Sequence, residues 1–185
     1  MLDVTKPTPL RLAGFIATAL GAVLIAVGSL QTWVTISLAG GSLSSPTPGT
    51  DLVDGKVTLA AGLVLLVGIL ALRIAAGGAR RLIAILLVVA ALLALAIGVN
   101  DAVRLKSRFQ PIAVDKIAIA VARDHGLPID AARTLVQEQA GRLIRTEAGI
   151  GLWLVIAGGA IGVGGGLLDL AWVGSELLPG KDAEG

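Results

Sequence analysis

Four long apolar runs without a charged residue limit the folds open to this 185-residue chain more than any other feature. The hydrocarbon core of a bilayer is roughly 30 Å thick and needs about 20 helical residues to cross it. Lipid supplies no hydrogen-bond partner for the backbone, so a single run of this kind has to be helical. We predict an all-α membrane protein, one four-span domain over residues 1–185. Its spans should cover about 12–31, 52–73, 82–100 and 148–170.

Basic residues in the short loops predict the orientation of these spans. The loop 73–81 carries three arginines and the N-terminal segment carries Lys6 and Arg11, whereas the first outer loop has only Lys56. Lys and Arg in short loops favour the cytoplasmic side, while a long structured connection such as 101–147 can translocate despite its charge. We expect both termini inside. The first run exceeds the ~7–15 apolar residues of a signal peptide, so we expect an uncleaved span.

The two outer connections differ in character. The stretch "TWVTISL" from Thr32 alternates and is β-branched, which predicts a short strand, and "GGSLSSPTPG" after it predicts a flexible loop. The connection 101–147 predicts an extramembrane helical hairpin. Its first helix should begin at Pro111 and end at Gly126, and Asp130 can cap a second helix that can run on into the fourth span. We expect the hairpin to rest on the bundle as an amphipathic cap, with a partner-binding or membrane-surface role as the alternative.

Glycines recur at helical spacing in the first and fourth spans. In lipid, helix association depends on close van der Waals contact, which faces of small residues permit. We predict that these two spans pack closely, within one chain or against a neighbouring copy. The residues of this helix-packing or oligomer interface are Gly14, Gly21, Gly28, Gly158, Gly162 and Gly166.

Charged and aromatic residues gather at the span ends, where we expect them to act as interfacial anchors. Two tryptophans should lie at one interface and the third at the other, and Asp169 can pair with Arg73 or Arg81. The cores of the spans hold no charge, which argues against a proton-coupled transporter but leaves open a passive pore of several copies. The expected anchors are Trp33, Trp153, Trp172, Arg73, Arg80, Arg81 and Asp169.

The stretch "GTDLVDGKVTLAAGL" opens the second span with two carboxylates. A calcium loop needs oxygen ligands at alternating positions, whereas Asp51 and Asp54 are three apart with apolar residues between them. A catalytic pair would need a base or a nucleophile beside it. The spacing suits a helix start, with Asp51 as N-cap and Asp54 in the first turn, both favoured by the helix dipole.

Composition limits the chemistry further. The chain has no cysteine, which excludes disulfides, thiolate metal sites and cysteine nucleophiles. The one histidine, His125, precedes Gly126 and should be an exposed turn residue rather than a ligand at membrane depth. A net charge of +2 without an extended basic block gives no argument for nucleic acid. We expect no enzyme activity, no cofactor and no metal site.

The stretches "GAVLIAVGSLQTW" and "GTDLVDGKVTLAAGL" with four spans resemble small tetraspan membrane proteins of actinobacteria and similar bacteria, a family of unknown function. The resemblance covers about the first 75 residues. It implies four spans in the bacterial plasma membrane rather than an activity. A looser likeness to claudin-type tetraspans rests on a strand-bearing first loop with a tryptophan, and the paired loop cysteines of that family are absent. The matching residues are Trp33, Gly49, Asp51, Asp54, Gly55, Thr58 and Leu59.

These features together predict a non-catalytic scaffold in the lipid bilayer. It should be an accessory or assembly subunit that binds other membrane proteins, or a homo-oligomer of copies of itself. The alternatives are a passive channel or solute carrier formed by several copies, and an envelope sensor that uses the outer hairpin.

Overall fold

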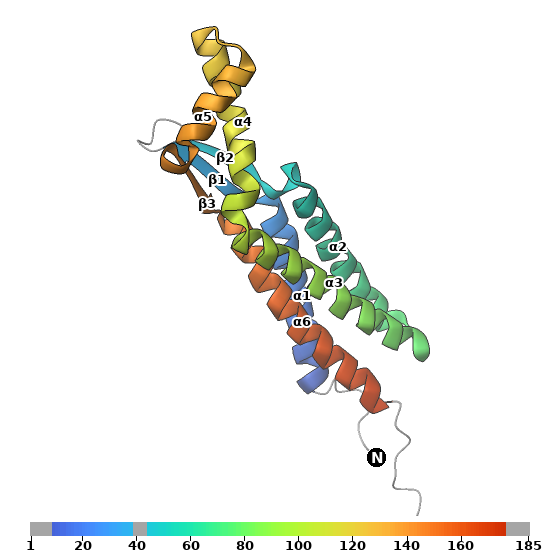
Figure 1. The fold of residues 1–185 in the computed structure, drawn as a ribbon. Helices are drawn as coiled ribbons and strands as arrows, with labels where there is room; N and C mark the ends of the chain where they lie inside the picture. The colour runs from blue at the N-terminus through green and yellow to red at the C-terminus, as the bar shows by residue number, and fades with distance from the viewer. Residues whose placement is uncertain (1–8, 39–43, 177–185) are drawn as a thin grey trace, which may run out of the picture.

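Four long helices form the body of the structure, a computed structural model that describes residues 9–38 and 44–176 (Figure 1). Lys6 and both chain ends lie outside these residues. Each of the four helices has the length and composition to cross a membrane. Long apolar helices are therefore confirmed at the four predicted positions to within six residues, and they suggest a multi-pass membrane protein. The helices are α1 (Pro9–Leu30), α2 (Val53–Ile74), α3 (Gly78–Val103) and α6 (Ile150–Glu176).

The four helices pack in a ring. Helix α1 packs against α2 and α6, and α3 packs against the same two neighbours. The centre of the bundle holds small and medium apolar residues such as Ala22, Ala61 and Leu65. The outer surface is also apolar, with Val67 and Leu70 about two-thirds exposed. Such a surface would be unfavourable in water and is the one that lipid requires.

A three-stranded sheet lies at one end of the bundle, so the expectation of an all-α fold is wrong in this respect. The central strand is β1 (Thr32–Leu38), as the sequence predicts. It pairs antiparallel with β2 (Ser44–Pro48) on one side and with β3 (Ile144–Ala148) on the other. Strand β2 belongs to the stretch expected to be a flexible loop, and its prolines are tolerated because it is an edge strand.

Strand β3 also corrects the expected path into the fourth span. The second helix of the hairpin, α5 (Ile129–Leu143), does not run on into α6, because the next five residues pair with β1. Gly149 follows, and its backbone N–H donates to the carbonyl oxygen of Trp33 at 2.7 Å. The fourth span is therefore tied to the first outer loop through this sheet.

The hairpin itself is present, but its first helix begins earlier than expected. Helix α4 (Leu105–His125) contains Pro111 in its interior instead of starting there. Gly126 ends it in the left-handed conformation, with φ of 63°, as the sequence predicts. Asp130 lies in the first turn of α5 but is not its cap, because the N-cap position is Pro128 and no side chain caps the helix there.

The hairpin rests mainly on the sheet, and the base of α4 also contacts the bundle. Phe109, Ala113 and Val114 of α4 pack in one apolar cluster with Trp33 and Val34 of the first outer loop. The far ends of α4 and α5 extend beyond the sheet, away from the four spans (Figure 1). We call the sheet together with α4 and α5 the head. The expected amphipathic cap on the bundle is therefore corrected to a hairpin that packs mainly on the sheet and projects from it.

Candidate functional site at the junction of head and spans

The re-entry of the chain into the second span is built around a buried tryptophan. Trp33 is fully buried, and its Nε1 donates to the carbonyl oxygen of Gly28 at 2.9 Å. Its predicted role as an interfacial anchor is therefore wrong. A buried indole keeps its N–H satisfied in this way, and the ring fills the space between the first span and the sheet.

Two glycines of the stretch at 49–63 make room for this arrangement. A side chain at Gly49 would overlap the indole of Trp33, and one at Gly55 would overlap the backbone of Gly49. Beside them, the hydroxyl groups of Ser29 and Thr58 are buried and 2.8 Å apart, which joins α1 to α2. Four of the residues that carry the resemblance thus lie together in this chain, namely Trp33, Gly49, Gly55 and Thr58.

The predicted helix-start role of the two carboxylates in that stretch is confirmed for Asp54 and wrong for Asp51. Asp51 lies in a short 3-10 helix, η1 (Gly49–Asp51), and is not the N-cap of α2. That position belongs to Leu52, without a side-chain hydrogen bond. Asp54 does lie in the first turn of α2, as expected, but its carboxylate is directed to the head.

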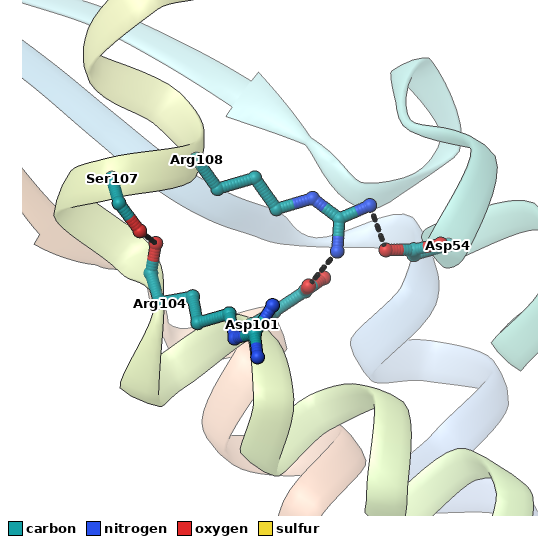
Figure 2. Close-up of polar contacts among 5 residues, drawn as sticks. All are labelled: Asp54, Asp101, Arg104, Ser107 and Arg108. Atoms are coloured by element: carbon teal, nitrogen blue, oxygen red, sulfur yellow. Dashed lines mark hydrogen bonds and ion pairs between the residues drawn. The ribbon is translucent and has the colours of Figure 1, made fainter.

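Arg108 joins the head to two of the spans (Figure 2). From α4 its guanidinium forms ion pairs with Asp54 at the start of α2 and with Asp101 near the end of α3. Asp101 is 1% exposed, whereas the Arg108 side chain is 41% exposed. No described residue donates a hydrogen bond to the second oxygen of Asp101, Oδ2. We call these three residues the junction cluster.

The junction cluster could be predicted only in part from the sequence. Asp54 at the start of the second predicted span and Asp101 just after the end of the third fall at the same edge of a four-span bundle. Arg108 was missed because the hairpin helix was expected to begin at Pro111. The signal that could have found it is spacing. Asp101 and Arg108 are seven residues apart, which places them on one face where a helix continues with little interruption. Helices α3 and α4 are separated only by Arg104.

The glycine faces serve the interior of this chain. Gly14, Gly21 and Gly28 of α1 all lie against α6. The α6 glycines are divided between two neighbours, since Gly158 meets α1, whereas Gly166 lies against Val88 of α3. Gly162 lies between Gly21 and Ala91, and so contacts both helices.

The opposite end of the bundle differs from the expected ring of anchors. Asp169 is 3% exposed and accepts a hydrogen bond from Thr18 Oγ1 at 3.0 Å, so it lies inside the α1–α6 contact and does not pair with Arg73 or Arg81. Arg73 instead lies over the ring of Phe15. Trp172 is also buried.

The remaining expected anchors keep positions that suit the role. Trp153 is 56% exposed near the head end of α6, where an amphipathic ring can lie in the interface. Arg81 is exposed near the start of α3, and Arg80, its neighbour, is half-buried over the ring of Trp172. Their anchoring role stays a prediction.

A groove runs between α4 and α5 in the head. Its volume is about 540 Å³, and one ion pair crosses it, from Arg133 Nε to Asp115 Oδ1 at 2.9 Å. Pro111 has no N–H, so the carbonyl oxygen of Ser107 lacks its helical donor at the base of the groove. The groove is lined by Ser107, Gln110, Pro111, Val114, Asp115, Arg133, Gln137 and Ala140.

The fold is a bundle of four helices long and apolar enough to cross a membrane, with a small head of sheet and helical hairpin at one end, and it suggests a multi-pass membrane protein. Within residues 9–38 and 44–176, no three histidine or acidic side chains gather to hold a metal ion. Comparison of the sequence with protein-family models and with curated proteins finds no match. The resemblance to bacterial tetraspan proteins stays a prediction.

Proposed function

We propose that this protein is a non-catalytic membrane scaffold whose head binds a segment of another membrane-associated protein, as an accessory or assembly subunit of a larger complex. The observation that carries the proposal is the groove between α4 and α5, which lies at the base of the hairpin, beside the sheet. The groove is in the head, outside the four spans.

The chemistry of the groove favours an extended peptide segment. Amide groups of Gln110 and Gln137 offer both donors and acceptors, and the carbonyl oxygen of Ser107, which has no helical N–H donor at Pro111, offers a further acceptor. Val114 and the ring of Pro111 supply apolar surface between them. Backbone N–H and C=O groups of a partner segment match such alternating polar and apolar positions.

A fixed head is the second support for a scaffold. The sheet packs on the outer ends of α3 and α6 through one apolar cluster, and the junction cluster ties α4 to α2 and α3. A partner bound at the hairpin would therefore be held at a defined place relative to the membrane. Pore formation has less support, because the described buried polar side chains of the bundle form separate groups near its two ends.

Two glutamines on α5 allow a matched test of the groove. Gln137 lines it, whereas Gln139 is exposed on α5 outside it. We expect Gln137→Arg to reduce the amount of larger particle by about tenfold when the chain is purified in mild detergent, because the larger charged side chain would fill part of the groove and would lose its water when a partner binds. A tenfold loss corresponds to about 1.4 kcal/mol. Gln139→Arg should leave the particle unchanged, as measured by size-exclusion chromatography with mass determination.

A strictly monomeric wild-type chain would contradict the scaffold proposal. An equal loss with both variants would argue that the binding surface is not the groove. Particles made only of this chain would instead favour the homo-oligomer.

We propose further that the protein lies in a bacterial plasma membrane with the head outside. The support is the loop 73–81 with its arginines, at the end of the bundle opposite the head. The chain has no cysteine, so single substitutions report cleanly. In intact cells an impermeant thiol reagent should label Ser45→Cys and should label Gly78→Cys only after permeabilisation. The reverse pattern would place the head in the cytoplasm.

A further inference from the structure

Arginines from three helices lie on aromatic rings at the end of the bundle opposite the head. The Arg11 guanidinium carbon of α1 lies 4.5 Å from the ring centroid of Trp172, and that of Arg80 of α3 lies 5.1 Å from the same ring. The Arg73 guanidinium of α2 lies 4.2 Å from the ring centroid of Phe15. We call Arg11, Arg73, Arg80 and Arg81 the arginine end.

Ring contacts fix the positions of Arg11 and Arg73 without using their hydrogen-bond donors. A guanidinium that lies over an aromatic face keeps its N–H groups at its edges, where they can bind a phosphate with two parallel hydrogen bonds. No described residue forms an ion pair with Arg11 or Arg73. Their donors therefore remain open to a ligand.

Positive charge gathers at this end. Arg11, Arg73 and Arg81 lie near the ends of α1, α2 and α3. Asp169 of α6 is buried and accepts a hydrogen bond from Thr18, so it does not lie on the surface beside them. An anionic ligand would be favoured there by charge complementarity.

The apolar residues around the arginine end suit a lipid as the ligand better than a free ion. Leu70 and Ile74 on the last turns of α2 are 67% and 87% exposed, and Leu82 on α3 is 59% exposed. These residues lie beside the guanidinium groups in the sequence and at the same end of the spans. A molecule with a phosphate head and acyl chains would match both the donors and this apolar surface.

We propose that the arginine end is a binding site for an anionic phospholipid of the bilayer. Arg11 and Arg73 bind the phosphate of the headgroup, and Arg81 adds to the local positive charge. Basic pockets between membrane helices bind such headgroups in general. The site is independent of the partner proposed for the head, because it lies at the other end of the spans.

The test compares lipids retained by the full-length protein. Purified protein is equilibrated with mixed micelles of phosphatidylglycerol and phosphatidylcholine of the same acyl chains, and bound lipid is counted by native mass spectrometry. We expect the wild-type protein to retain phosphatidylglycerol preferentially. Arg11→Gln and Arg73→Gln should each reduce that preference about fivefold. Arg123→Gln, an exposed position on the hairpin, should not change it.

Other results would overturn the proposal. Equal retention of the two lipids by wild type, or an unchanged preference in both variants, would exclude a specific site. Displacement of the lipid by millimolar inorganic phosphate would indicate a phosphate site instead. A preference seen only after Asp182→Asn and Glu184→Gln would mean that the C-terminal segment of the chain is the occupant. Should Arg11→Gln not fold, the exposed Arg73→Gln alone decides between these outcomes.

Discussion

Gly21→Ala is expected to separate α1 from α6 and to lower the stability of the bundle by about 1–3 kcal/mol, the usual cost of overpacking a tight contact. The added methyl carbon would lie 2.6 Å from the backbone nitrogen of Gly162 and 2.7 Å from the carbonyl oxygen of Gly158. Backbone atoms cannot rotate away as a side chain can, so the two helices have to move apart along their whole contact.

The matched control is a glycine on α6, the helix against which α1 packs at Gly21. Gly164 is on α6, but a methyl group there would meet nothing within 4 Å. Alanine is the better helix former at either position, so the propensity change is shared and the difference between the two variants reports packing. Apparent melting temperatures in one detergent provide the measurement. Equal values for Gly21→Ala and Gly164→Ala would contradict the proposed role of the glycine face.

The features that lipid dictates could be predicted from the sequence. Four helices have to appear where four apolar runs are long enough, and glycine spacing of seven within a span has to place those residues on one face. The strand beginning at Thr32 also has a local signal, since its β-branched alternation is unlike the spans around it.

The features that depend on distant parts of the chain could not be predicted. The residues of β3 continue a helical pattern, and only pairing with β1, more than a hundred residues earlier, makes them a strand. Trp33 was expected in the interface because indole rings favour it. Its burial depends on the space left by Gly49 and on the acceptor provided by Gly28. The ion pairs of Arg108 likewise depend on the start of α4 at Leu105, before Pro111.

The second large effect is expected at the junction cluster. Arg108→Gln would leave the buried carboxylate of Asp101 without its cation, beside a second carboxylate from Asp54. Breaking a buried ion pair by removing one partner costs about 3–5 kcal/mol. Because the Arg108 side chain is 41% exposed, we expect a loss near the lower end of that range.

A surface ion pair in the same hairpin supplies the control. Arg133 and Asp115 are about half exposed and pair at 2.9 Å. Exposed pairs contribute about 0–1 kcal/mol, so Arg133→Gln should change the melting temperature little. Hydrogen exchange of α4 separates the two cases further. Arg108→Gln should raise exchange at the base of α4, where the helix meets the spans, and Arg133→Gln should not.

The double variant decides whether charge or packing makes Arg108 necessary. With Asp101→Asn, the buried side chain is neutral and no longer requires a cation, so Arg108→Gln combined with Asp101→Asn should recover most of the stability that Arg108→Gln loses. A double variant as unstable as Arg108→Gln alone would mean that the arginine acts through its contacts with the head. Recovery would instead show that a buried negative charge on the third span, compensated from the hairpin, couples the position of the head to the bundle.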